Sequence, residues 1–96
     1  MGYTDIRKLV YETAVQFARR GAGWAQERPV LHEVGKKLDI RGSSQTEQLI
    51  LTCWHDLFHL GKLSWGFDLD NPNAPFFHVP GSDAEREREL AGASKR

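Results

Sequence analysis

Residues 49–79 read LILTCWHDLFHLGKLSWGFDLDNPNAPFFHV, and the spacing of their apolar residues changes from helical to extended after Gly61. Up to about Leu60, the apolar residues recur at the spacing that places them on one face of a helix. Glycine is suited to ending a helix, and beyond Gly61 apolar residues alternate with small or polar ones, as in a half-buried strand. The loop 68–75, with its asparagines and prolines, leads to a second short strand at 76–79. The stretch therefore predicts a helix followed by a two-stranded β-hairpin.

Two further helices are predicted before this stretch. Residues 4–20 carry apolar side chains at helical spacing, and the glycines within 21–23 end that helix. Residues 24–28 are expected to connect it to a second helix, which begins at Pro29 because proline is tolerated in the first turn. Gly35 lowers the helix propensity of this second helix by about 1 kcal/mol relative to alanine. A glycine at this position also allows another helix to approach closely.

A short turn separates the second predicted helix from the third. Residues 39–44 form this turn, and Ser44 with Glu47 fits a capping box at the start of the third helix. Three helices followed by a β-hairpin is the order of elements in a winged helix. We therefore expect an α+β fold, a three-helix winged helix-turn-helix with a two-stranded β-hairpin wing, over residues 1–81. Residues 82–96 are expected to be a charged, flexible tail or the truncated start of a longer segment.

Three motifs within residues 49–79 carry a resemblance to a known class of domain. The segments WHDLF, GKLSWG and NPNAPF resemble the end of the third helix, the first wing strand and the wing loop of winged-helix modules in larger prokaryotic proteins. Some of those proteins are associated with defence against phage. The resemblance covers roughly half of the chain and implies the winged-helix fold, without identifying what the domain binds. The matching residues are Trp54, Asp56, Leu57, Phe58, Gly61, Leu63, Trp65, Gly66, Asn71, Pro72, Pro75 and Phe76.

The composition bounds the location and the partners of the protein. The chain has 96 residues and one cysteine, and no apolar run approaches the length that crosses a membrane. Residues 1–8 hold no apolar segment of the kind found in secretory signals, so we expect a soluble, cytoplasmic protein without a membrane partner. Its 13 basic and 13 acidic side chains give a net charge of zero. Because phosphate neutralisation supplies much of the affinity for DNA, DNA binding by this chain requires a local excess of positive charge.

The outward face of the third helix is the candidate DNA-binding surface. In a winged helix this helix enters the major groove, where glutamine pairs with adenine and the threonine methyl group contacts thymine. Lysine and arginine beside the helix hold phosphates. The candidate base-contacting residues are Gln45, Thr46, Gln48, Thr52 and His55, and the candidate phosphate-contacting residues are Lys36, Lys37, Arg41 and Lys62. We expect double-stranded DNA as partner, and a transcriptional regulator, dimeric if it acts alone, or a module of a defence-related protein.

An alternative hypothesis is a winged helix that binds another protein and does not contact DNA. The third helix lacks lysine and arginine and carries Glu47 and Asp56, while the wing loop carries Asp68 and Asp70. These carboxylates repel a phosphate backbone. The aromatic residues of the wing would supply a partner surface where they are exposed, namely Trp65, Phe67, Phe76 and Phe77. Salt dependence separates the two hypotheses, because only phosphate binding weakens steeply with salt.

Side chains capable of catalysis or metal binding do not form a recognised motif. His55 and His59 lie four residues apart, as zinc ligands do, but Asp56 stands where a metalloprotease has glutamate. Cys53 lies on the apolar face of its helix and is expected to be a small buried hydrophobic residue. No phosphate-binding loop is present. The sequence therefore predicts a non-catalytic protein without metal or cofactor.

Overall fold

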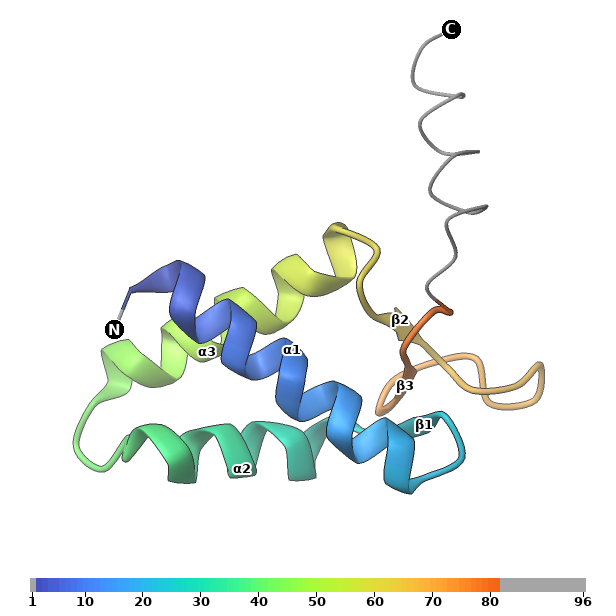
Figure 1. Ribbon diagram of the computed structural model, residues 1–96, viewed down its shortest axis with the longest axis horizontal. Helices are drawn as coiled ribbons and strands as arrows, with labels where there is room; N and C mark the ends of the chain where they lie inside the picture. Colours follow the sequence, from blue (N-terminus) through green and yellow to red (C-terminus); the bar gives the residue numbers. More distant parts are fainter. Residues whose placement is uncertain (1, 82–96) are drawn as a thin grey trace, which may run out of the picture.

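The computed structural model describes residues 2–81 as an α+β arrangement of helices and a small sheet (Figure 1). The predicted tail, residues 82–96, lies outside the described residues. The elements in chain order are α1 (Tyr3–Arg20), β1 (Trp24–Gln26), α2 (Glu27–Leu38), α3 (Ser44–His59), β2 (Ser64–Trp65) and β3 (Phe76–His78). The three predicted helices are therefore confirmed, and their ends differ from the predicted ones by at most two residues.

The sheet has three strands, whereas the sequence predicted two. It is antiparallel with the order β1-β3-β2, so that β3 lies between the strand that precedes α2 and the strand that follows α3. Residues 24–28, predicted to be a connector, contain β1 and the first two residues of α2, which begins at Glu27 rather than at Pro29. The backbone N–H of Glu27 donates to the carbonyl of Pro75 at 2.9 Å, which ties the start of α2 to the sheet. This order of elements and strands is compatible with a winged-helix layout.

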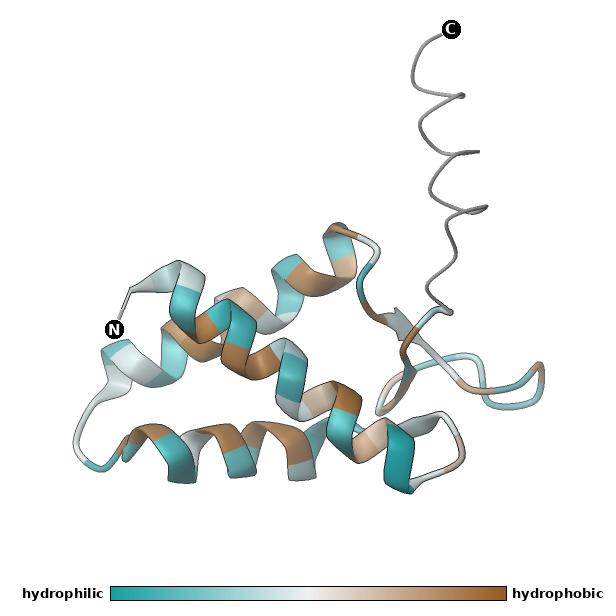
Figure 2. Ribbon diagram, viewed as in Figure 1, coloured by the Kyte–Doolittle hydropathy of each residue, from teal (hydrophilic) through white to brown (hydrophobic). Residues whose placement is uncertain are grey.

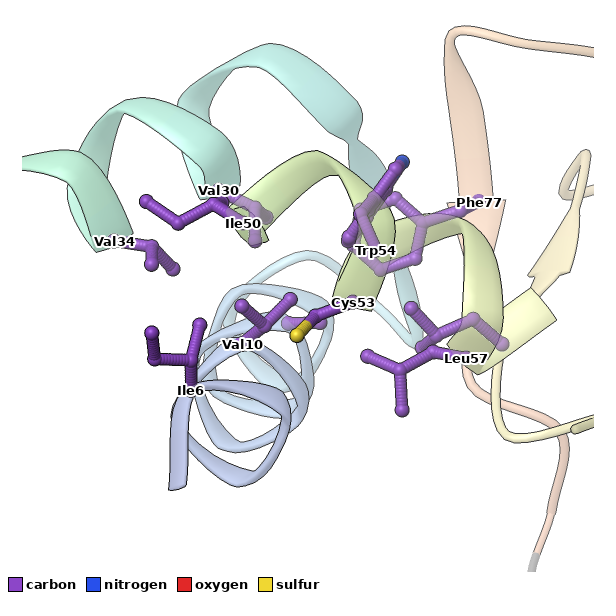
Figure 3. Packing of buried hydrophobic residues seen from close by; sticks show 11 residues of the cluster. Ile6, Val10, Val30, Val34, Ile50, Cys53, Trp54, Leu57 and Phe77 are labelled. Carbon is purple, nitrogen blue, oxygen red and sulfur yellow. The ribbon is translucent and has the colours of Figure 1, made fainter. Parts of the chain in front are cut away.

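The core lies where α1 crosses α2 and α3. Apolar and polar segments alternate along all three helices, as amphipathic packing requires (Figure 2). Ile6 and Val10 of α1 point toward Val34 of α2 and toward Ile50 and Cys53 of α3 (Figure 3). The core continues to the sheet through Trp54, Leu57, Leu63 and Phe77, all of them buried. One continuous apolar core therefore holds the helices and the sheet together.

Both ends of α3 are determined by capping interactions. At its start the Oγ of Ser43 accepts a hydrogen bond from the backbone N–H of Thr46 at 3.2 Å. The predicted capping box of Ser44 and Glu47 is therefore wrong by one residue: Ser43 is the cap, and Ser44 is the first helical residue.

The C-terminal end of α3 is a Schellman motif. The N–H of Lys62 donates to the carbonyl of Leu57 at 2.9 Å, and that of Gly61 donates to Phe58 at 3.1 Å. Gly61 adopts a φ of 74°, which glycine tolerates best, so the prediction that it ends the helix is confirmed, with Leu60 as the C-cap residue. The sharp reversal carries Leu63 back into the core.

Gly35 makes room for the side chain of Ile40, which lies in the turn between α2 and α3. Asp39 follows the last residue of α2 and has a φ of 50°, which reverses the direction of the chain. As a result, the N–H of Ile40 donates to the Gly35 carbonyl at 3.3 Å. A Cβ on Gly35 would lie 3.0 Å from the Cδ1 of Ile40. The close approach that the sequence suggested is therefore made by the residue after the α2 cap, and not by another helix.

The loop between β2 and β3, residues 66–75, is held by backbone and side-chain contacts at several points. Gly66 has a φ of 88°, and a Cβ there would lie 2.7 Å from the backbone of Pro72, so this position requires glycine. The ring of Phe67 stacks on Trp24 with centroids 4.0 Å apart. The N–H of Phe67 also donates to the carbonyl of Asn71 at 3.0 Å. These contacts give the loop, which we call the wing loop, a defined shape.

Candidate nucleic-acid interface

The outward face of α3 carries a stripe of uncharged polar side chains. Ile50, Cys53, Trp54 and Leu57 bury the opposite face of the helix. The stripe residues recur every three or four positions and are all exposed, so they share the face that points away from the core. The α3 stripe consists of Gln45, Gln48, Thr52, His55 and His59. Its first four residues were predicted as DNA contacts, and the same spacing extends the stripe to His59.

Two threonines of α3 differ in what they leave free for a ligand. Thr46 is half-buried; its backbone N–H donates to the Oγ of Ser43, and its Oγ1 accepts a hydrogen bond from the Ser43 hydroxyl. It serves the helix cap and lies outside the α3 stripe. Thr52 is exposed, and its hydroxyl donates to the carbonyl of Gln48 at 2.9 Å. Thr52 therefore retains only acceptor capacity and its methyl group for recognition.

The four predicted phosphate-contacting residues are distributed over different surfaces. Lys36 and Arg41 lie beside the N-terminal half of α3. The Nζ of Lys37 instead donates to the Oγ1 of Thr13 at 3.3 Å, which directs this side chain to α1. Lys62 is exposed in the turn that follows α3. The structure therefore places Lys36 and Arg41 together and separates Lys37 from them.

Arg41 does not offer an unpaired charge. Its Nε and Nη2 donate to the two carboxylate oxygens of Asp39 at 2.7 and 3.2 Å. The hydrogen bonds from this guanidinium hold the pKa of the Asp39 carboxyl below its ordinary value. Near pH 7 both side chains are therefore ionised, and their charges cancel. Both side chains are exposed, and a phosphate would have to compete with Asp39 for the guanidinium. Lys36 and Lys62 have no ion-pair partner among residues 2–81.

A groove runs between α2 and α3 beside the α3 stripe. It encloses about 790 Å³, and its apolar surface comes from Leu31, Ile40, Ile50 and Leu51 around Gly35. Its charged or titratable lining residues are His32, Lys36, Asp39, Arg41 and Glu47. This groove was not predicted from the sequence. The available signal was Leu51, an apolar residue next to the buried stripe of α3, which is 42% exposed in the structure.

The acidic residues do not all face the candidate interface. The hydroxyl of Tyr3 donates to a carboxylate oxygen of Asp56 at 2.5 Å, which places this charge against α1. The same bond raises the pKa of the Tyr3 hydroxyl. Glu47 lines the groove, and Asp68 and Asp70 lie exposed in the wing loop. The repulsion expected from Asp56 is therefore reduced by its position, whereas that from Glu47 and the wing loop remains.

The surroundings of Cys53 and of the histidines bear on catalysis and metal binding. Cys53 is buried as predicted, with its Sγ 3.7 Å from the carbonyl of Tyr3, and burial raises the pKa of its thiol. A neutral buried thiol is a poor nucleophile. His55 and His59 line a hollow of about 300 Å³ with Phe58 and Trp65. Within residues 2–81, no three His, Cys, Asp or Glu side chains gather as metal ligands.

Cys53 is expected to resist alkylation in the folded protein. Its side chain is fully buried and its thiol is held neutral, so a water-soluble reagent requires a local or global opening to reach the thiolate. We expect slow reaction with iodoacetamide at mildly alkaline pH and fast reaction in denaturing guanidinium chloride, measured by mass spectrometry. Native labelling as fast as that of a free thiol would contradict the position of Cys53 in the core.

Neither the hydropathy of the described helices nor the comparisons with known proteins identify a function. None of the helices within residues 2–81 is both long and apolar enough to cross a membrane. The candidate interface consists of the α3 stripe, the cations Lys36 and Lys62 near its two ends, and the wing loop. Neither a family model, nor a curated protein, nor a solved structure matches this chain.

Proposed function

We propose that this chain is a non-catalytic winged helix-turn-helix module that binds double-stranded DNA with α3 in the major groove. The observation that carries the proposal is the α3 stripe. Its exposed, uncharged polar side chains follow one face of a helix that a short turn joins to α2. Glutamine and threonine on such a face offer the donors, acceptors and methyl groups that base edges recognise. The module would act as a small regulator or within a larger protein.

Contacts to DNA phosphates contribute only a modest part of the affinity in the proposed complex. Lys36 lies beside the N-terminal half of α3 and Lys62 follows its C-terminal end, so they flank the stripe. Arg41 contributes only if it leaves Asp39. With two or three phosphate contacts, the affinity falls by about 10- to 40-fold between about 50 and 200 mM salt. This is a shallower dependence than that of a strongly basic domain.

The test is binding of a fluorescently labelled duplex of mixed sequence, followed by anisotropy at low and at physiological salt. Lys36→Glu should weaken binding by about tenfold, since it removes one phosphate contact and adds a repulsive charge. Lys37→Glu is the matched control, because it makes the same change of charge on a side chain that points to α1. Circular dichroism checks that both variants fold. Failure of the unsubstituted protein to bind at low salt would refute the proposal.

A protein-binding winged helix is the second candidate, and two features of the structure favour it. The groove between α2 and α3 has an apolar surface, and the wing loop presents Asp68 and Asp70 where a DNA-binding wing meets phosphates. An apolar interface of this kind is insensitive to salt. A partner that stays bound at high salt while DNA does not bind at low salt would favour this candidate.

A further inference from the structure

The tip of the wing loop exposes one leucine almost completely. Leu69 is 97% exposed, more than any other large hydrophobic side chain among residues 2–81. A protein surface carries many scattered apolar residues, but one held at the end of a well-defined loop is suited to insertion into a partner.

The loop that carries Leu69 is ordered before any partner binds. Leu69 and Asp70 are the central residues of a turn that is closed at both ends by Asp68 and Asn71. One carboxylate oxygen of Asp68 accepts hydrogen bonds from the N–H of Asp70 at 3.0 Å and from the N–H of Asn71 at 2.7 Å. The stacking of Phe67 on Trp24 holds the base of the turn. Insertion of Leu69 therefore orders little additional backbone.

The groove between α2 and α3 offers the complementary shape. Its volume of about 790 Å³ accommodates a leucine side chain with part of the turn that carries it, and Leu31, Ile40, Ile50 and Leu51 supply apolar contacts. Leu51 is 42% exposed while the groove is open. Covering it with Leu69 removes both leucines from water.

Charges beside the two apolar surfaces select one orientation. The Asp70 carboxylate and the Lys36 ammonium group each lack a partner among residues 2–81. Lys36 lies on the α2 side of the groove, whereas Glu47 lies on the α3 side. Asp39, the other carboxylate of the groove, is already bound by Arg41. An Asp70 carboxylate that approaches the groove would therefore pair with Lys36 and stay away from Glu47.

The two surfaces lie at opposite ends of the same molecule. Figure 1 shows the turn between α2 and α3 at one end and the wing loop at the other. The groove includes Asp39, Ile40 and Arg41 of that turn. A wing loop therefore does not reach the groove of its own chain. A second copy is the partner on which both the apolar fit and the charge pair are present, and a net charge of zero does not oppose its approach.

We propose that the wing tip of one copy, residues 68–71, docks into the α2–α3 groove of a second copy, with Leu69 inserted between the helices and Asp70 paired with Lys36. The contact joins two different surfaces, so each added copy leaves one free wing tip and one free groove. The contact area is small, and the association is weak and depends on concentration. This proposal does not rest on DNA binding, because it is measured without DNA.

Sedimentation velocity over a range of protein concentrations tests the association. We expect the weight-average sedimentation coefficient to rise with concentration for the unsubstituted chain. Leu69→Ser should weaken the association by more than about tenfold. Leu60→Ser is the matched control, because Leu60 is also an exposed leucine (55%) but belongs to neither surface, and it should leave the association unchanged.

Mixing variants separates this contact from any other mode of self-association. Leu69→Ser retains an intact groove, and Leu51→Glu retains an intact wing tip. Each should be monomeric alone, and their mixture should form a complex of one copy of each and nothing larger. In the same way, Asp70→Lys and Lys36→Glu should each weaken the association, and their mixture should restore it. The charge pair tests the proposal even if Leu51→Glu unfolds.

The opposite results would overturn the proposal. An unsubstituted chain that stays monomeric at every concentration shows that the two surfaces do not bind each other. Association that survives Leu69→Ser, or that Leu60→Ser weakens equally, places the contact elsewhere. Failure of both mixtures to form the expected complex also excludes the docking of wing tip into groove. Each of these results leaves the DNA-binding proposal as it stands, since the duplex assay is separate.

Discussion

Replacing Trp54 by alanine is expected to lower the free energy of unfolding by about 3–5 kcal/mol, the range for large aromatic residues truncated in a core. The Trp54 side chain is 0% exposed and joins α3 to the sheet. Its ring lies edge-on to Phe58 and Phe77, with centroids 5.1 Å away in each case, and to Trp65 at 6.2 Å. A domain of this size has a total stability near the lower end of about 5–15 kcal/mol. The variant should therefore be largely unfolded under mild denaturing conditions, as measured by urea titration with far-ultraviolet circular dichroism.

Trp54→Phe is the matched control for this experiment. The Nε1 of Trp54 is buried without a hydrogen-bond partner among residues 2–81. Phenylalanine removes this unsatisfied N–H and keeps much of the ring, so its loss of stability should be clearly smaller than that of alanine. Equal losses for the two variants would mean that the ring contacts of Trp54 contribute little, contrary to the packing described.

Gln48→Glu is expected to weaken DNA binding by about 10- to 100-fold, which corresponds to about 1–3 kcal/mol for one base-pairing side chain. Gln48 lies near the middle of the α3 stripe and is exposed. Glutamate has nearly the same shape but lacks the amide donor that pairs with adenine, and its charge is repelled by the phosphates. The measurement is duplex anisotropy at constant low salt.

The control for Gln48→Glu makes the same chemical change elsewhere. Gln16 is exposed on α1, outside the proposed interface, and Gln16→Glu changes the net charge by the same amount. It should reduce the affinity by much less. If both variants weaken binding equally, the effect follows from net charge, and α3 does not read the bases.

The elements predicted from the sequence were those whose signals are local. The three helices have apolar faces that repeat along a single segment, and α3 ends through hydrogen bonds from Gly61 to Phe58 and from Lys62 to Leu57, three and five positions earlier. β1 was missed because its three residues lie between the turn 21–23 and the start of α2, where a short segment looks like a connector between two helices. Its partner β3 lies about fifty residues away, with Trp24 opposite His78. Such a short strand forms because it pairs with β3, and its own residues do not predict it.

The part of the candidate site that was predicted also depends on local signals within one helix. Helical spacing alone placed Gln45, Gln48, Thr52 and His55 on one outward face. The neighbours of the basic residues were not predictable from the sequence. Lys36 and Lys37 are adjacent in the chain, but Lys36 lines the groove, whereas Lys37 donates a hydrogen bond to α1. Arg41 likewise meets Asp39 only because the chain reverses between α2 and α3.

By itself the sequence determined the three amphipathic helices, the buried state of Cys53, and the polar face of α3, because each follows from the period of apolar residues within one segment. The tertiary structure alone decided the third strand, the groove and the almost complete exposure of Leu69 at the opposite end of the molecule. These features depend on distances between segments far apart in the chain. Such distances are set by the packing of the whole core, where α1 brings α2 and α3 together and the sheet closes one end.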